Sequence, residues 1–239
     1  MSWLHLVRHG QAGTRIEYDS LSELGVDQAR RLGKHLQNQN LELTRVVSGG
    51  LKRQIETARV VEAMFRASQI AFPLIEVDPA WNEFDLEAVY RELAPHLAAE
   101  DPEFREHLAQ MDLVMDDPLH PVHRKWTAGD VAVIRAWMEG RFPVKSTESW
   151  IEFQGRIGGA FERLIAQAGR GSIMVFTSAT PVGIAMARVL GLEPRDAMRL
   201  AGSLLNSSVS TVRHRPDDLS LFNFNTVGHL ADPRHHTFR

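Results

Sequence analysis

Short apolar runs along the chain end in polar turns, and after each turn the apolar residues recur at helical spacing. The runs at Trp3–Val7, Arg45–Val47 and Ser172–Phe176 are rich in branched residues and are typical of buried strands. Strand–turn–helix units repeated in this order predict an α/β fold with a mostly parallel central sheet.

Periodicity also predicts the remaining secondary structure. Helices are expected over Ser22–Leu36, Arg53–Met64, Ser149–Gln167 and Val182–Leu190, the first with Ser22 as its N-cap. Strands of weaker pattern are expected over Ile70–Val77, Asn206–Val212 and Leu219–Asn225. Pro73 interrupts the first of these strands, so we expect that strand at an edge of the sheet, where a missing N–H donor is tolerated.

Residues 85–145 differ in character from the rest of the chain. This stretch has a mainly helical pattern broken by prolines, and it holds twelve Asp and Glu against seven Lys and Arg. We interpret it as a helical cap inserted into a single domain of residues 1–239. An acidic cap that lines a cleft would disfavour highly anionic substrates.

Composition narrows the choice of function. The 239 residues are 44% hydrophobic and 24% charged, as in ordinary globular proteins. A net charge of −3 without a basic cluster argues against nucleic acid and membrane partners. The chain has no cysteine, which excludes disulfides and thiolate chemistry, and it shows neither a signal peptide nor a membrane span, so we expect a cytoplasmic protein. The pattern gives no indication of an oligomeric state.

The motif Arg8-His9-Gly10 stands directly after the first predicted strand. It delivers a cation and an imidazole to the carboxyl end of the sheet, where open α/β sheets bind their ligands. Gly10 allows the backbone to turn sharply there. The motif therefore predicts an anionic ligand beside His9.

Other turns point to the same edge of the sheet. Arg53 lies in the first turn of the helix after the second strand, and Thr177-Ser178-Ala179-Thr180 opens the helix after the central strand. Free N–H groups at these helix N-termini favour an anion. Glu83 stands between Trp81 and Phe84, and apolar neighbours of this kind favour a protonated carboxyl that can act as an acid, although the aromatic residues also suit plain packing.

Taken together, these motifs resemble the histidine phosphatase superfamily, also called phosphoglycerate-mutase-like. The resemblance implies a three-layer α/β/α sandwich and a phosphohistidine intermediate on His9. It also implies that Arg8 and Arg53 clamp the phosphoryl oxygens, and that Glu83 protonates the leaving group and then activates water. Neutral His9 is the nucleophilic form, and the two arginines favour it.

One position departs from the family pattern. Ser178 stands where the family usually has a second histidine. The Ser178 hydroxyl and the N–H groups of Ser178 and Ala179 are expected to bind the phosphoryl group instead. The loss of a cationic donor predicts low activity. His229 is interpreted as structural, with compensation for the missing histidine as the alternative.

Three functions remain open from the sequence. The favoured one is a phosphatase that acts on a small phosphomonoester, and the others are a phosphoglycerate mutase and a non-catalytic module that binds phosphorylated ligands. Gln11 and Arg15, which follow the first motif, are expected to contact the substrate, and Trp126 is a further candidate for the leaving-group pocket. We expect no cofactor and no metal, because His235-His236 has no partners at metal-ligand spacing.

Overall fold

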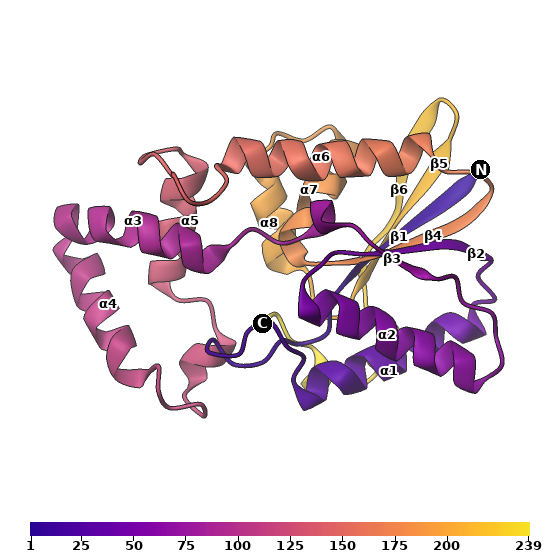
Figure 1. Ribbon diagram of the computed structural model, residues 1–239, viewed down its shortest axis with the longest axis horizontal. Helices are drawn as coiled ribbons and strands as arrows, with labels where there is room; N and C mark the ends of the chain where they lie inside the picture. The colour runs from indigo at the N-terminus through magenta and orange to yellow at the C-terminus, as the bar shows by residue number, and fades with distance from the viewer. The chain divides into compact units, whose positions relative to one another are not determined.

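A six-stranded mixed sheet is the centre of the computed structural model, which describes residues 1–239 (Figure 1). Its strands are β1 (Ser2–Arg8), β2 (Leu43–Ser48), β3 (Ile75–Val77), β4 (Gly171–Thr177), β5 (Val209–Arg215) and β6 (Asp218–Thr226), in the order β3-β2-β4-β1-β5-β6. The first four strands are mutually parallel, while β5 runs antiparallel to β1 and forms a hairpin with β6. The predicted α/β class with a mostly parallel sheet is confirmed.

Eight α-helices and three short 3-10 helices complete the chain. The α-helices are α1 (Glu23–Asn38), α2 (Lys52–Ala67), α3 (Leu86–Glu100), α4 (Pro102–Val114), α5 (Ala128–Met138), α6 (Trp150–Ala166), α7 (Ala179–Leu190) and α8 (Asp196–Ser203). The 3-10 helices are η1 (Pro79–Trp81), η2 (Pro121–Arg124) and η3 (Pro233–His235).

The chain forms two compact units. The first comprises residues 1–13, 17–83 and 157–238, and the second comprises residues 14–16, 84–156 and 239. The sheet belongs to the first unit. The predicted cap, residues 85–145, lies within the second unit, which extends to residue 156.

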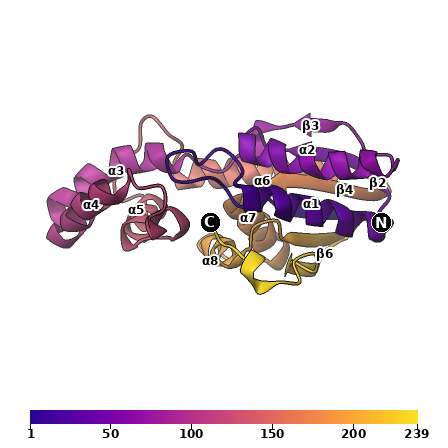
Figure 2. The ribbon, with the colours of Figure 1, turned by 90° about the horizontal axis from the view of Figure 1, so that it is seen from below.

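In the first unit, α1 and α2 lie side by side on one face of the sheet (Figure 1, Figure 2). Their apolar faces and alternate strand residues form a buried cluster made of Val7, Leu32, Leu36, Val46, Ala58, Val61, Phe65, Met174, Phe176 and Val209. Alternation along the strands sends Leu6 and Val175 to the opposite face, which α7 and the end of α6 cover (Figure 1). Helices on both faces make the three-layer arrangement that the family resemblance implies.

The second unit is helical and has its own aromatic core. Phe84 stacks on Trp137 with ring centroids 4.6 Å apart, and Phe153 meets Phe84 edge-on at 5.6 Å. Its helices begin at side-chain caps: Asp85 accepts a hydrogen bond from the Ala88 N–H, and Thr127 caps α5. The unit therefore buries an apolar centre without using the sheet.

Most predicted elements are confirmed to within a few residues, and the differences have local causes. Strand β3 is confirmed at the sheet edge but begins only at Ile75, after Pro73. Helix α8 was not predicted, because it is short and packs through the small residues Ala197 and Ala201. Helix α7 begins at Ala179, three residues earlier than expected.

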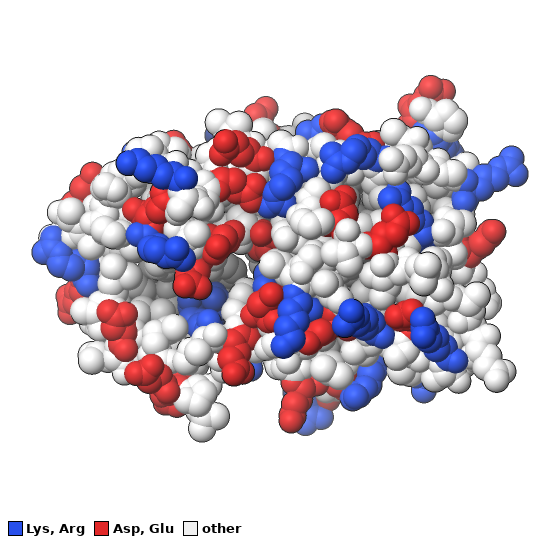
Figure 3. All heavy atoms as spheres, viewed as in Figure 1, with Lys and Arg blue, Asp and Glu red and all other residues white.

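None of the helices combines the length and apolar character that a membrane span requires. On the face shown in Figure 3, basic and acidic side chains are interspersed.

Candidate active site

The carboxyl ends of β1 and β4 place His9 and Ser178 next to each other along the sheet edge. Arg8 pairs with Thr177 in the parallel ladder, so His9 and Ser178 each follow a paired residue. The His9 N–H also donates to the Thr177 carbonyl oxygen over 2.9 Å. Neighbouring strands are about 4.8 Å apart, which makes this the edge at which one ligand can meet both residues.

The His9 ring is buried and held in one tautomer. Its Nδ1 lies 2.7 Å from the Gly10 carbonyl oxygen, which can only accept, so Nδ1 carries the proton. Its Nε2 accepts a hydrogen bond from Nε of Arg53 over 3.3 Å. Burial, and then the charges of Arg53 and Arg8, hold the pKa of His9 well below its ordinary value. His9 is therefore a neutral imidazole whose lone pair on Nε2 faces a cation.

The backbone around His9 is tightly fixed. A Cβ at Gly10 would lie 2.4 Å from the Gly25 carbonyl oxygen, so only glycine fits there. The Gly10 N–H donates to Oγ1 of Thr57 over 3.1 Å. On the other side, the His9 carbonyl oxygen accepts from the Ser207 N–H over 3.1 Å. These contacts pre-organise the imidazole.

Arg53 is held from the loop before α1 by two residues that no sequence pattern indicated. Its Nη1 donates to Oδ1 of Asp19 over 2.9 Å, and its guanidinium lies 4.7 Å from the centre of the Tyr18 ring. Asp19 also accepts from the N–H groups of Lys52 and Arg53 at the start of α2. The only available signal was that a buried arginine needs a counter-ion, since an acidic residue in a polar loop carries no pattern of its own.

Arg8 is buried, and both of its terminal nitrogens donate to backbone carbonyl oxygens. Its Nη1 donates to the Leu204 carbonyl oxygen over 2.5 Å, and its Nη2 donates to the Phe238 carbonyl oxygen over 2.6 Å. Its charge still acts on the pKa of His9. Binding of a phosphoryl group by Arg8 stays a prediction.

Glu83 and Ser178 lie at the N-terminus of α7. Oε2 of Glu83 accepts from the Thr180 N–H over 3.1 Å, which ties the carboxyl group to the first turn of the helix. Ser178 is the N-cap residue, and Ala179 is the first helical residue, whose N–H has no partner within the helix. Oγ of Ser178 accepts from the Gln54 amide over 2.8 Å, a contact that the sequence did not suggest.

The other predicted substrate residue of the first unit is Gln11, which ties its own loop to α1. Its N–H donates to Oε1 of Gln28 over 2.7 Å, and its Oε1 accepts from Oγ of Ser22 over 2.9 Å. A role of Gln11 in substrate binding stays a prediction.

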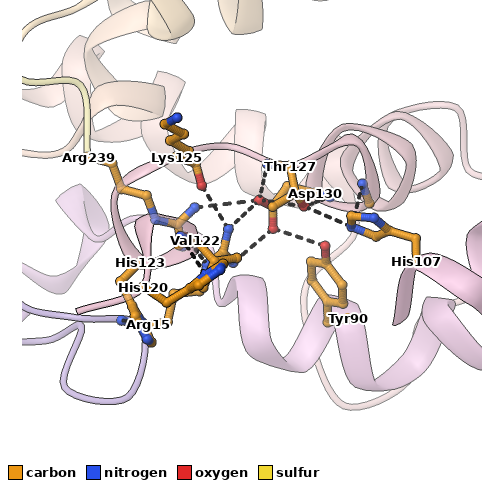
Figure 4. Close-up of polar contacts among 11 residues, drawn as sticks. Arg15, Tyr90, His107, His120, Val122, His123, Lys125, Thr127, Asp130 and Arg239 are labelled. Carbon is orange, nitrogen blue, oxygen red and sulfur yellow. Dashed lines mark hydrogen bonds and ion pairs between the residues drawn. The ribbon is translucent and has the colours of Figure 1, made fainter. Parts of the chain in front are cut away.

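Arg15 belongs to a buried polar cluster of the second unit (Figure 4). Its guanidinium makes two hydrogen bonds to the Asp130 carboxylate, of 2.5 and 3.1 Å, and it also donates to the carbonyl oxygens of Val122 and Lys125. The Tyr90 hydroxyl donates to Asp130 over 2.9 Å. Arg15 thus anchors the cluster, and its expected contact with substrate stays a prediction.

Arg239 brings a second cation to Asp130, with Nη1 3.7 Å from the carboxylate (Figure 4). The Arg239 guanidinium lies 4.7 Å from the centre of the Trp126 ring. Burial alone would raise the pKa of Asp130, but hydrogen bonds from Arg15 and the Thr127 N–H, together with the arginine charges, lower it. Asp130 is therefore a buried carboxylate shared by two arginines.

Two further histidines, His5 and His229, have side-chain partners in the first unit. Nδ1 of His5 lies 3.1 Å from Oγ1 of Thr211, and burial lowers the pKa of His5 to about 4. Nε2 of His229 lies 2.8 Å from Oγ of Ser207, and the structural role of His229 stays an interpretation. No group of three or more His, Asp or Glu side chains is arranged to hold a metal ion.

A neutral histidine beside an arginine at the carboxyl ends of parallel strands is an arrangement suited to an anionic ligand. The chain belongs to the histidine phosphatase superfamily (branch 1), whose family model matches residues 4–118 and 114–226. This membership agrees with the resemblance found in the sequence.

Individual relatives match only about half of the chain. The chain is 29% identical over 119 residues to the mitochondrial serine/threonine-protein phosphatase Pgam5 of Caenorhabditis briggsae, and 30% identical over 114 residues to that of Caenorhabditis elegans. These matches cover 49% and 46% of this chain but only 40% and 37% of the relatives.

Solved structures share the fold over nearly the whole chain. A phosphoserine phosphatase mutant of Entamoeba histolytica in complex with phosphoserine has a TM-score of 0.62 at 16% identity, covering 96% of this chain and 100% of that one. The alpha-ribazole phosphatase of Shigella flexneri has a TM-score of 0.61 at 20% identity, covering 94% and 96%.

Proposed function

We propose that this protein is a phosphatase that hydrolyses small phosphomonoesters through a phosphohistidine on His9. The observation that carries the proposal is the state of the His9 ring, a neutral buried imidazole with Nε2 toward Arg53 and Nδ1 donating to Gly10. Membership of the histidine phosphatase superfamily supports phosphatase activity.

In the first half of the reaction, the lone pair on Nε2 of His9 forms a bond to phosphorus and the ester P–O bond breaks. Protonated Glu83 gives its proton to the departing alkoxide oxygen. Arg8 and Arg53 bind the phosphoryl oxygens and stabilise their charge. The hydrogen bond from Nδ1 to Gly10 stabilises the positive charge that the ring gains.

In the second half, a water oxygen bonds to phosphorus and the P–N bond breaks, so the electron pair returns to Nε2. Glu83, now a carboxylate, accepts the proton of the attacking water. Inorganic phosphate leaves, and both His9 and Glu83 regain their starting protonation states. The hydroxyl of Ser178 and the N–H of Ala179 serve as further donors to the phosphoryl oxygens at the N-terminus of α7.

Release of inorganic phosphate from an aryl phosphate tests the proposal. We expect slow release by the wild type and none by His9→Ala. The matched control is His96→Ala, which removes an exposed histidine of α3 and should leave the rate unchanged. Equal release by wild type and His9→Ala contradicts the proposal.

Ser178, in place of the usual second histidine, favours one alternative function. This alternative is a non-catalytic module that binds phosphorylated ligands. This alternative predicts tight binding of phosphate esters by wild-type protein without turnover. Transfer of phosphate between positions of phosphoglycerate without net release would instead indicate a mutase. The same assay, followed by product analysis, separates these outcomes.

A further inference from the structure

The Gln54 side chain is buried in the first turn of α2, directly after Arg53. Its Oε1 accepts from the Leu51 N–H over 3.2 Å. Its Nε2 donates to the Trp81 carbonyl oxygen over 3.3 Å and to Oγ of Ser178 over 2.8 Å. Gln54 therefore bridges the start of α2, the segment before Glu83 and the N-terminus of α7.

The orientation of the Gln54 amide is determined by backbone groups. The Leu51 N–H can only donate and the Trp81 carbonyl can only accept, so a reversed amide would set donor against donor and acceptor against acceptor. A Cβ at Gly49 would lie 2.1 Å from Oε1 of Gln54, so the turn after β2 leaves room for this side chain only because it has glycine there. Nε2 must consequently face Ser178.

This orientation decides what the Ser178 hydroxyl can do. A serine hydroxyl has one proton to donate and can accept at its oxygen. The structure gives Oγ of Ser178 one hydrogen bond, in which it accepts from Gln54. Ser178 is only 1% exposed, so water does not readily take its proton. The hydroxyl is thus a buried donor, and Gln54 occupies one of the two lone pairs on its oxygen.

We propose that Gln54 is a positioning residue for phosphoryl transfer, because its hydrogen bond fixes the Ser178 oxygen so that the hydroxyl proton can be donated to a phosphoryl group bound at His9. The strand register places Ser178 beside His9, since both follow the paired residues Arg8 and Thr177. The Gln54–Ser178 pair then supplies the donor that the second histidine gives in the usual family pattern. This inference rests on the function proposed above and adds a residue to it.

A double-mutant cycle tests the inference, with Ser178→Ala, Gln54→Met and the double variant compared for kcat/KM on an aryl phosphate. Ser178→Ala removes the donor and should lower kcat/KM about 100-fold. Gln54→Met keeps the size of the side chain but releases the hydroxyl, and we expect a loss of about tenfold. The double variant should be no slower than Ser178→Ala, because Gln54 acts only through Ser178.

A second readout separates positioning from mere packing. Vanadate should bind more weakly to Ser178→Ala and Gln54→Met by the same factors as kcat/KM falls, since it occupies the phosphoryl position. Ser178→Thr keeps the hydroxyl and should restore most of the rate. The matched controls are Ser172→Ala, at the other end of β4, and Gln37→Met on α1, and both should match wild type. Thermal unfolding midpoints identify any variant that fails to fold.

The outcomes distinguish this inference from the proposed function. If Ser178→Ala leaves both kcat/KM and vanadate affinity unchanged, or if the two single losses multiply in the double variant, the role of Gln54 is overturned. Dependence of the rate on His9 would still stand in that case. If wild-type turnover does not depend on His9, the proposed function fails, and vanadate affinity in the same variants still decides the role of Gln54.

Discussion

Nε of Arg53 donates a hydrogen bond of 3.3 Å to Nε2 of His9, so the lone pair that would attack phosphorus faces a cation. A guanidinium in this place disfavours a protonated ring and offers its edge to phosphoryl oxygens. Arg53 therefore helps to keep His9 neutral and lies where it can also bind the phosphoryl group.

Arg53→Gln should lower kcat/KM on an aryl phosphate by about 100- to 1000-fold, because a charged donor to the phosphoryl group is lost. Removing the cation should also raise the pKa of His9, although burial continues to lower it. The acid limb of the pH–rate profile should then move to higher pH. Arg59→Gln, an exposed arginine of the same helix, is the control. An unchanged rate in Arg53→Gln would refute the role assigned to this side chain.

Asp19 should affect catalysis, because it orients Arg53 and accepts hydrogen bonds from the first N–H groups of α2. Asp19→Ala should lower kcat/KM by about 10- to 100-fold through misplacement of the guanidinium. Asp19→Asn keeps an acceptor and should retain most of the activity. Steady-state kinetics check both variants, with Asp27→Asn on α1 as a surface control. Equal losses in the Ala and Asn variants would show that charge, rather than orientation, is what Asp19 provides.

The buried cluster around Asp130 should stabilise the second unit. Asp130→Asn leaves Arg15 and Arg239 without their carboxylate charge and should lower the free energy of unfolding by about 3 kcal/mol. Tyr90→Phe removes one hydrogen bond and should cost about 1 kcal/mol. Urea unfolding followed by tryptophan fluorescence checks this, because Trp126, Trp137 and Trp150 all lie in the second unit. If Asp130→Asn lowers the free energy of unfolding by less than Tyr90→Phe does, Asp130 does not anchor the cluster.

His229 should make the protein less stable in acid. Burial, and then His35, lower the pKa of His229 to about 3 from an ordinary value of 6.5. Below pH 6.5 the His229 ring binds a proton in the unfolded chain but not in the folded chain. The free energy of unfolding therefore falls as pH drops from 6.5 toward 3. His229→Gln should reduce this slope by at most about 1.4 kcal/mol per pH unit.

Urea unfolding at several pH values measures the contribution of His229. His96→Gln replaces an exposed histidine and should leave the slope as in wild type. If His229→Gln and wild type lose stability in parallel between neutral and acid pH, His229 does not bury a neutral ring.

The sequence was most informative where chemistry and periodicity coincide. The strands before His9, Arg53 and Ser178 show short apolar runs, and parallel strands must present their carboxyl ends at one edge, so the grouping of these three residues was predictable. The change of composition at residue 85 lies next to the start of the main segment of the second unit at residue 84.

Residues that act through other residues could not be found in this way. Asp19 is recognised only by its contact with Arg53, and Gln54 only by its contact with Ser178. Arg15 lay close enough to the motif to suggest substrate binding, yet its guanidinium is engaged by Asp130 of α5, far along the chain. Such pairings depend on tertiary structure, for which spacing along the sequence gives no rule.

Trapping the phosphorylated protein tests the central claim most directly. Wild-type protein quenched during turnover of an aryl phosphate should carry a phosphoryl group that is labile in acid and stable in base, as a phosphohistidine is, and peptide mapping should assign it to His9. Glu83→Gln should accumulate more of this adduct, because the carboxylate that activates water is lost. Turnover without any adduct on His9, or an adduct that persists in His9→Ala, would contradict the account.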